Sequence, residues 1–176
     1  MMECFECGRQ MECSKEIYHF KECGLDNAFL DSVEVCRCPC GEVEVCIPAM
    51  KELHQLIGLQ IIRKDSLLDG KEIKFLRKSL GLSGIKLHQI MGANNSTISR
   101  WESGSQQISE PNDKLLRMIY VTLADLSLVT KEDQITVMRS LVNNSFPGIK
   151  TVVGAMQKYL IPVNTPGACS IPSLAF

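Results

Sequence analysis

The order of hydrophobic and polar residues divides the chain into a strand-rich N-terminal part and a helical remainder. The stretches SVEVCRC (32–38) and EVEVCIP (42–48) alternate apolar and polar residues, which is typical of β-strands. The apolar positions that follow are spaced by three and four residues: Met50, Leu53, Ile57 and Ile61. This spacing predicts a helix with one apolar face that begins at Pro48 and ends near RKDSLLDG (63–70).

Three short helices with recognisable ends are predicted between residues 69 and 104. Asp69, Ser83 and Asn94 stand where an N-terminal cap is needed, because their side chains accept hydrogen bonds from free backbone N–H groups. A glycine that suits the left-handed conformation follows each segment: Gly81, Gly92 and Gly104. The residues expected to face inward are Ile73, Leu76 and Leu80, then Leu87, Ile90 and Met91, then Ile98 and Trp101. A helix, a tight turn and a second short helix form the helix-turn-helix arrangement.

The C-terminal third continues with weaker helical patterns. Pro111 opens a longer helix whose expected apolar face comprises Leu115, Ile119, Leu123 and Leu126. A capping box of Thr130 and Asp133 predicts the start of another helix, with Ile135, Met138 and Val142 on one side. The stretch 146–160 is interpreted as a further helix, and the proline-rich sequence from Pro162 onward as a loop or disordered tail.

These elements together predict an α+β fold, with a small β-rich module followed by an all-α part. The expected boundaries are residues 1–47 for the module, 48–68 for a helical linker, 69–126 for the helix-turn-helix domain and 127–176 for a helical C-terminal extension with a loop-like tail. The chain has 176 residues and 45% hydrophobic content, which suits one ordinary domain or two small ones.

The sequence contains no apolar run of the roughly 18 residues that a membrane span needs, and its N-terminus does not resemble a signal peptide. We therefore expect a cytoplasmic protein that does not interact with membranes. In that compartment the nine cysteines are expected to be metal ligands or free thiols rather than disulfides.

Charge is distributed unevenly although the net charge of the whole chain is only −1. Residues 1–50 carry four basic and ten acidic side chains, for a net charge of −6. Residues 70–120 carry eight basic and four acidic side chains, for a net charge of +4. The asymmetry predicts different partners for the two parts, and the basic one is suited to a polyanion.

The cysteines of the N-terminal module suggest a bound metal ion. Cys4 and Cys7 have the two-residue gap that lets two thiolates hold one tetrahedral ion, and the second pair has to come from Cys36, Cys38 and Cys40. A module of this size buries too little apolar surface to fold unaided, and a structural metal supplies the missing free energy. Four thiolates leave no open position for water, so the expected role is structural rather than catalytic.

The segment NNSTISRWESG (94–104) predicts a polar surface on the third short helix. If Ile98 and Trp101 face the core, the side chains left outside are Asn95, Ser96, Thr97, Ser99 and Arg100, beside the capping residue Asn94. A recognition helix presents such residues to base edges in the major groove of DNA. Lys86, with Lys74 and Lys78, is placed to contact phosphates. The alternative is a simple surface helix in which Arg100 pairs with Glu102 or with solvent.

The stretch LRKSLGLSGIKLHQIMGANNSTISRWESG (76–104) resembles the Xre-type helix-turn-helix of phage repressors and antitoxins. Two positions depart from that pattern. Gly84 replaces a glutamine that in the family commonly helps to hold the DNA backbone, and His88 replaces a small alanine that lets the two helices approach closely. We expect His88 to be a partly exposed surface residue that leans outward or widens the helix crossing.

The N-terminal stretches YHFKECGLDN and CPCGE resemble the zinc-finger module of MqsA/YgiT-type antitoxins, in which a zinc module precedes an Xre-type helix-turn-helix. The resemblance implies that Cys38 and Cys40 form the second ligand pair beside Cys4 and Cys7 around Zn²⁺, with Cys36 as the main substitute. Three further cysteines are then interpreted as apolar filler: Cys13, Cys23 and Cys46.

The same resemblance implies an autoregulatory transcriptional regulator that acts as a homodimer on double-stranded operator DNA in its own promoter. Half-sites would lie about one helical turn apart. The acidic zinc module would meet a protein partner such as a cognate, basic ribonuclease-type toxin.

An enzyme is not expected, because His19, His54 and His88 lie far apart without a paired acid and no phosphate-binding glycine loop occurs. A thiol-redox role for the cysteines is a weaker rival, because a reactive thiol needs a nearby cation and the module is acidic. The main alternative is a protein-interaction adaptor whose helix-turn-helix no longer binds DNA.

Overall fold

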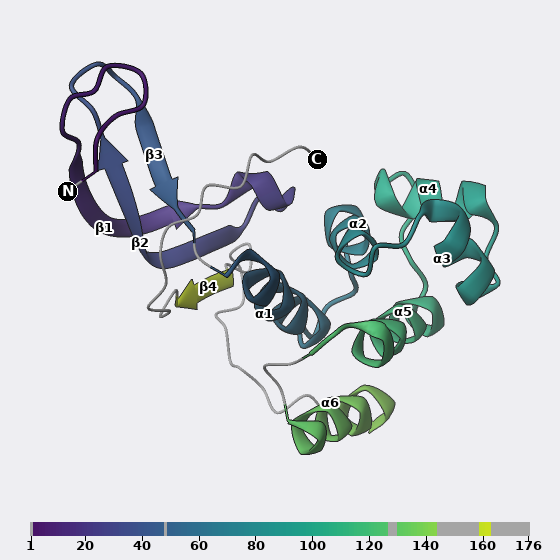
Figure 1. The fold of residues 1–176 in the computed structure, drawn as a ribbon. Coiled ribbons are helices and arrows are strands. Elements are labelled where there is room, and N and C mark those ends of the chain that lie inside the picture. The colour runs from purple at the N-terminus through teal and green to yellow at the C-terminus, as the bar shows by residue number, and fades with distance from the viewer. Residues whose placement is uncertain (1, 48, 127–129, 144–158, 163–176) are drawn as a thin grey trace.

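A small sheet lies at one end of the molecule and helices make up the other end; three of the sheet's strands come from the N-terminal third of the chain and one from the C-terminal region (Figure 1). The computed structural model describes residues 2–47, 49–126, 130–143 and 159–162. The elements in chain order are β1 (Glu12–His19), the 3-10 turn η1 (Lys21–Cys23), β2 (Ala28–Arg37), β3 (Val43–Cys46), α1 (Met50–Ile62), α2 (Gly70–Ser79), α3 (Gly84–Met91), α4 (Asn95–Glu102), α5 (Glu110–Leu123), α6 (Lys131–Asn143) and β4 (Tyr159–Pro162). The predicted α+β class is confirmed.

The sheet has β2 at its centre. β1 pairs with β2 in antiparallel register from Glu12 opposite Arg37 to His19 opposite Phe29, and β3 pairs with the C-terminal part of β2. β4 runs parallel to β2 and pairs with residues 28–31. Because β1 occupies one edge of β2 along its length, β3 and β4 share the other edge.

The strand β4 corrects the prediction for the C-terminal region. Tyr159 and Leu160 were expected to end a helix over 146–160, and Pro162 to begin a loop, but all three belong to β4. These residues pair with the part of the β2 edge that β3 leaves open, so backbone bonding to a distant strand overrides the local pattern. The remainder of that expected helix and of the tail lies outside the described residues.

One hydrophobic core joins the sheet to the helices. Phe20 and Leu30 of the N-terminal part pack in the same cluster as Ile57 of α1 and Leu76 of α2. Helix α1 lies between the sheet and the other helices (Figure 1). The fit is close at Gly58 of α1, where an added Cβ would lie 2.0 Å from the Tyr120 hydroxyl oxygen. Glycine is therefore what allows α5 to approach α1.

The predicted helix caps are confirmed. The Asp69 carboxylate accepts a hydrogen bond from the Glu72 backbone N–H, and the Glu72 carboxylate accepts one from the Asp69 N–H, so α2 begins with a full capping box. Ser83 caps α3, and Asn94 caps α4 by accepting from the Ser96 N–H. Thr130 caps α6 through the Asp133 N–H, while its hydroxyl donates to the Asp133 carboxylate.

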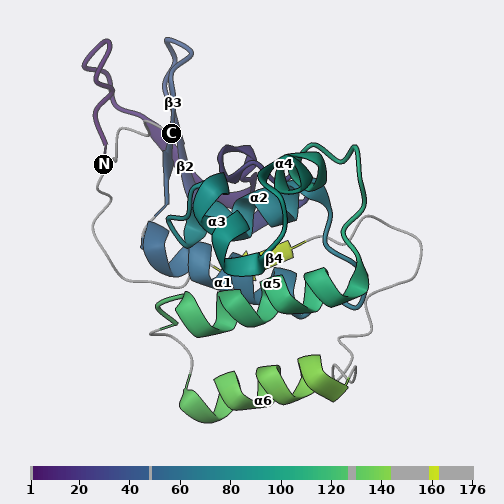
Figure 2. The ribbon, with the colours of Figure 1, turned by 90° about the vertical axis from the view of Figure 1, so that its right-hand side faces the viewer.

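The buried faces of three helices differ from the predicted ones. Four residues expected to face inward are substantially exposed: Ile90, Leu115, Leu123 and Ile135. Helix α5 instead buries Leu116 and Tyr120, and α6 buries Val137 and Leu141. Two apolar stripes on one helix can share the same spacing, and the neighbouring element determines which of them is covered. Here α5 is covered by α1 on one side and by α6 on the side away from α3 and α4 (Figure 2).

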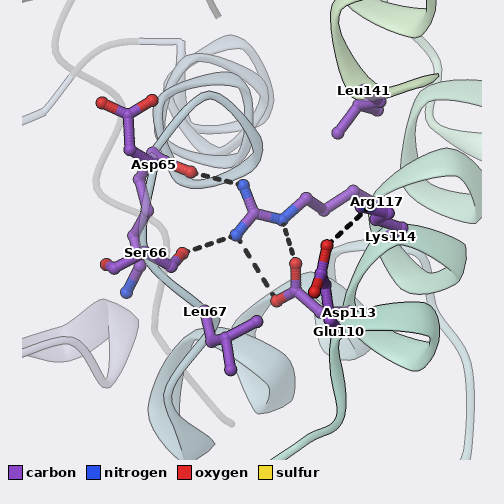
Figure 3. Close-up of a pocket in the computed structure, with 9 residues that line it drawn as sticks. Asp65, Ser66, Leu67, Glu110, Asp113, Lys114, Arg117 and Leu141 are labelled. Carbon is purple, nitrogen blue, oxygen red and sulfur yellow. Dashed lines mark hydrogen bonds and ion pairs between the residues drawn. The ribbon is translucent and has the colours of Figure 1, made fainter. Parts of the chain in front are cut away.

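A buried arginine holds the segment that connects α1 to α2. The Arg117 guanidinium donates hydrogen bonds to the backbone carbonyls of Ile62, Lys64 and Ser66, at 3.0, 2.6 and 2.7 Å. Its Nε lies 2.8 Å from Oδ2 of Asp113, one turn earlier on α5 (Figure 3). These groups line a cavity of about 400 Å³ that also contacts Leu141 of α6. Arg117 thus fixes the position of α1 relative to α5.

Among the described residues, none of the helices has both the length and the apolar content needed to cross a membrane.

Candidate metal centre and polar helix surface

Four cysteine sulfurs meet at the end of the sheet. The Sγ atoms of Cys4, Cys7, Cys38 and Cys40 all lie within 4.8 Å of one another. The Cys4 and Cys40 sulfurs are 3.7 Å apart, and the Cys7 and Cys38 sulfurs are 3.4 Å apart. The structure therefore brings together the four cysteines proposed as ligands, close enough to hold a metal ion.

Two tight turns present these sulfurs. The Gly8 N–H donates to the Cys4 carbonyl, and the Gly41 N–H donates to the Cys38 carbonyl, both at 2.9 Å. Both glycines have a positive φ, of 68° and 100°, which residues with a Cβ rarely adopt. The first turn precedes β1 and the second connects β2 to β3. The antiparallel pairing of β1 with β2 places the two turns side by side.

The donor set fits a tetrahedral ion. Cys4 and Cys38 are buried, whereas Cys7 and Cys40 reach the surface. The Cys40 backbone N–H lowers the pKa of Cys38, but burial and hydrogen bonding with the other three sulfurs raise it to about 12 in the absence of metal. A metal ion has to displace those protons to bind, and four thiolates would then complete its coordination.

A second, smaller core supports this end of the sheet. It consists of Cys4, Met11, Cys36 and Cys38, with Met2 packed against it, and it is separate from the main core. We call residues 2–11 and 36–42 the metal tip. Because its apolar core has only these side chains, the tip depends on cross-links for its stability.

A disulfide joins Cys13 of β1 to Cys36 of β2. This pairing corrects three expectations: that the cysteines are metal ligands or free thiols rather than disulfides, that Cys13 is apolar filler, and that Cys36 is the substitute metal ligand. Cys46, which was also interpreted as apolar filler, is disulfide-bonded as well. Cys13 and Cys36 are direct partners in the strand register, which brings their Cα atoms to 4.0 Å. Sequence alone could not show this pairing, since the register depends on residues far from both cysteines. Cys23 remains a free thiol and donates to the Phe20 carbonyl.

Helix α4 separates its polar and apolar residues as predicted. Ile98 and Trp101 are buried in the main core. The exposed residues comprise Asn94, Asn95, Ser96, Ser99 and Arg100, while Thr97 is half-buried. On the preceding helix Lys86 is exposed. Apart from Thr97, the polar side chains predicted for α4 and its cap are therefore exposed to solvent.

The ion pair of Glu102 with Arg77 bears on one alternative for Arg100, in which Arg100 would pair with Glu102. The Arg77 guanidinium of α2 forms an ion pair with the Glu102 carboxylate: its Nε donates to Oε1, and its Nη2 donates to Oε2 at 2.9 Å. Its Nη1 also donates to the Leu82 carbonyl. Glu102 is thus already occupied. Within the part of the chain that the structure describes, the Arg100 side chain takes part in no ion pair.

The same ion pair positions α4. Besides the Arg77–Glu102 contact, Gly70 at the start of α2 lies so close to α4 that an added Cβ would be 2.6 Å from the carbonyl oxygens of Trp101 and Glu102. Sequence reasoning missed both features. The position of Arg77 within the LRKSLG stretch carries no sign of its partner 25 residues away.

The two positions that depart from the Xre pattern have defined surroundings. A Cβ added at Gly84 would meet the Asn95 side-chain oxygen at 3.4 Å, an ordinary contact distance. The ring Nδ1 of His88 is hydrogen-bonded to the Ala93 carbonyl in the turn before α4. His88 is half-buried, so it neither leans fully outward nor stands free.

Comparison with known proteins gives no family assignment: no protein-family model, curated protein or solved structure matches this chain.

Proposed function

We propose that the protein is a sequence-specific DNA-binding transcriptional regulator, in which α3 and α4 act as a helix-turn-helix of the Xre type. The observation that carries this proposal is that Arg100 is exposed on α4 and has no ion-pair partner among the described residues. Glu102, two residues later, is already paired with Arg77. An arginine in that position is suited to paired hydrogen bonds with a guanine in the major groove.

The neighbouring side chains support the same assignment. Asn95, Ser96 and Ser99 are exposed along with Arg100 and offer donors and acceptors to bases or phosphates. Lys86 on α3 is exposed and suited to a phosphate contact. The ion pair from α2 and the buried Ile98 and Trp101 hold α4 in place, so the surface is presented by a rigid element.

We propose further that the four-cysteine site holds a structural Zn²⁺. Cys4, Cys7, Cys38 and Cys40 supply four sulfurs, the donor type that zinc prefers in closed sites. Such an ion would cross-link the two turns of the metal tip. With no open coordination position, the site is suited to folding and not to catalysis.

The metal tip is proposed to meet a protein partner, in line with the resemblance to MqsA/YgiT-type antitoxins. Residues 1–50 carry a net charge of −6, which favours a basic partner. Phe5, between Cys4 and Cys7, is 79% exposed and offers an apolar anchor at the end of the molecule. A cognate basic toxin would fit these properties, and a homodimer on an operator palindrome would follow from the same resemblance.

A second candidate is an adaptor that uses α3 for protein contact instead of DNA. Ile85 and Ile90 of α3 are 60% and 40% exposed, an apolar composition that a protein partner would cover. Gly84 also lacks the side chain that helps to hold the DNA backbone in the Xre pattern. This candidate predicts no preference for any duplex sequence.

The deciding experiment selects bound duplexes from a random DNA library and then titrates the best one across salt concentrations. We expect one enriched sequence and an affinity that falls steeply with salt. Arg100→Ala should cost about 1 to 3 kcal/mol of specific binding. Arg139→Ala is the matched control, because Arg139 is an exposed arginine of α6 on the far side of α5. No enrichment, or equal losses for both variants, would contradict the assignment.

A further inference from the structure

The Cys13–Cys36 disulfide has one accessible and one buried cysteine. Cys13 is exposed on β1, at the outer edge of the sheet. Cys36 is only 3% exposed and packs in the small core of the metal tip with Cys4 and Cys38. A reductant can therefore approach the bond from the Cys13 side, while Cys36 packs in the same small cluster as the candidate ligands Cys4 and Cys38.

The position of Cys36 on β2 makes it a fifth cysteine beside the metal centre. Val33 and Val35 point into the main core, so Cys36 projects from the opposite face of the strand. Cys38 follows two residues later and packs in the same small cluster as Cys36. While Cys36 is bonded to Cys13, its sulfur cannot form the thiolate that binds a metal ion. Reduction would make it a thiol next to the ligand Cys38.

We propose that the Cys13–Cys36 bond is a thiol–disulfide exchange site that controls whether Cys36 can act as a reserve ligand for the metal centre. This inference rests on the proposed metal function of the four-cysteine site. The reacting partner is a dithiol reductant. The acidic surroundings, with a net charge of −6 over residues 1–50, disfavour an anionic monothiol such as glutathione.

The exchange proceeds in two balanced steps. A thiolate of the dithiol attacks Sγ of Cys13, the accessible sulfur, which forms a mixed disulfide and releases Cys36 as a thiolate. The second thiol of the reductant then attacks the reductant sulfur that is bonded to Cys13, which closes the reductant into a cyclic disulfide and releases Cys13. Two electrons and two protons pass from the dithiol to the protein, leaving two cysteine thiols and an oxidised, cyclic reductant.

The test uses Co²⁺ as a spectroscopic probe of thiolate ligands in the full-length chain, with any reductant removed before the metal is added. The oxidised wild-type protein should bind Co²⁺ with the absorption of a tetrahedral four-sulfur site. Oxidised Cys38→Ser should show the weaker spectrum of three sulfurs. After treatment with dithiothreitol, the same variant should recover the four-sulfur spectrum, because Cys36 replaces the missing ligand.

Two further variants isolate the role of Cys36. The double variant C13S/C38S should give the four-sulfur spectrum without reduction, because Cys36 has no disulfide partner. The double variant C36S/C38S should keep the three-sulfur spectrum in both redox states. Cys23→Ser is the matched control for a free thiol far from the tip and should behave as wild type. The fluorescence of Trp101, the only tryptophan, verifies that each variant has a folded helical part.

The outcomes separate this inference from the metal assignment. If the wild-type protein binds no Co²⁺, the metal function itself fails. If the wild type binds Co²⁺ but reduction leaves Cys38→Ser unchanged, the reserve-ligand inference is wrong. Should Cys38→Ser not fold, mass spectrometry of the wild type decides by thiol alkylation. When the protein is unfolded without reductant and then alkylated, Cys13 and Cys36 must be protected before native treatment with dithiothreitol and modified after it, and their continued protection overturns the inference.

Discussion

Replacing Arg117 by methionine should destabilise the protein by about 3 to 5 kcal/mol. Methionine fills a similar volume but cannot donate to the carbonyls of Ile62, Lys64 and Ser66. The larger effect comes from Asp113, which is 3% exposed and would lose its counterion inside the protein. Removing one member of a buried ion pair leaves an uncompensated charge, which costs more than the lost hydrogen bonds alone.

The double variant R117M/D113N provides the internal check on that reasoning. The Asp113 Oδ1 atom also accepts a hydrogen bond from the Leu68 backbone N–H at 2.8 Å. Asparagine keeps an acceptor for this bond but carries no charge. We therefore expect the double variant to be more stable than Arg117→Met alone, although less stable than wild type.

Urea denaturation followed by Trp101 fluorescence measures these differences, because Trp101 is buried in the core that α1, α2 and α5 share. Arg139→Met is the control, since Arg139 is exposed and its replacement should change stability by less than about 0.5 kcal/mol. A loss below about 1 kcal/mol for Arg117→Met, or a double variant less stable than the single one, would refute the assigned role of the buried charge.

Three other predictions concern separate parts of the molecule. Cys4→Ser should abolish tight metal binding and increase backbone hydrogen exchange in the metal tip alone, because the small core of the tip is separate from the main core. Faster hydrogen exchange in α2 or α5 would contradict this prediction. Burial lowers the pKa of His54 below its ordinary value, so the unfolded chain binds a proton at a higher pH than the folded protein does. The free energy of unfolding should therefore fall as the pH decreases from about 6.5 toward the folded-state pKa. Denaturation at several pH values should show this slope in the wild type and a smaller slope in His54→Phe. Gly58→Ala should cost about 1 to 3 kcal/mol because the new methyl group overlaps Tyr120, whereas Gly84→Ala, whose methyl group has ordinary contacts, should be within about 0.5 kcal/mol of wild type in the same denaturation assay.

Features that depend on neighbouring residues in the chain were predicted correctly from the sequence. The caps of α2, α3 and α4 at Asp69, Ser83 and Asn94 are examples, because a cap bonds to a backbone N–H only two or three residues away. The division of α4 into a buried side with Trp101 and an exposed side with Arg100 follows from helical geometry in the same way. Alternation of apolar and polar residues also identified β2 and β3, and helical periodicity identified α1, whereas β1 was not singled out and part of β4 was expected to be helical.

The site was predicted in part. The pairs Cys4 with Cys7 and Cys38 with Cys40 do meet, although the second pair rested on a family resemblance because the sequence left Cys36 as an alternative. The disulfide that removes Cys36 from the ligand set depends on the register of β1 with β2. A shift of the strands by one residue would separate the two cysteines, and neither sequence stretch reveals its register alone.

By itself the sequence determined the local chemistry of this protein: where helices begin, which turns can present sulfur atoms, and which residues of α4 share a side. Only the tertiary structure decided which partner each group meets, such as Arg77 with Glu102, Arg117 with three carbonyls, and β4 with the open edge of β2. The physical reason is distance along the chain. A cap or a turn is settled within a few residues, whereas a buried ion pair or a strand pairing depends on how the whole core packs.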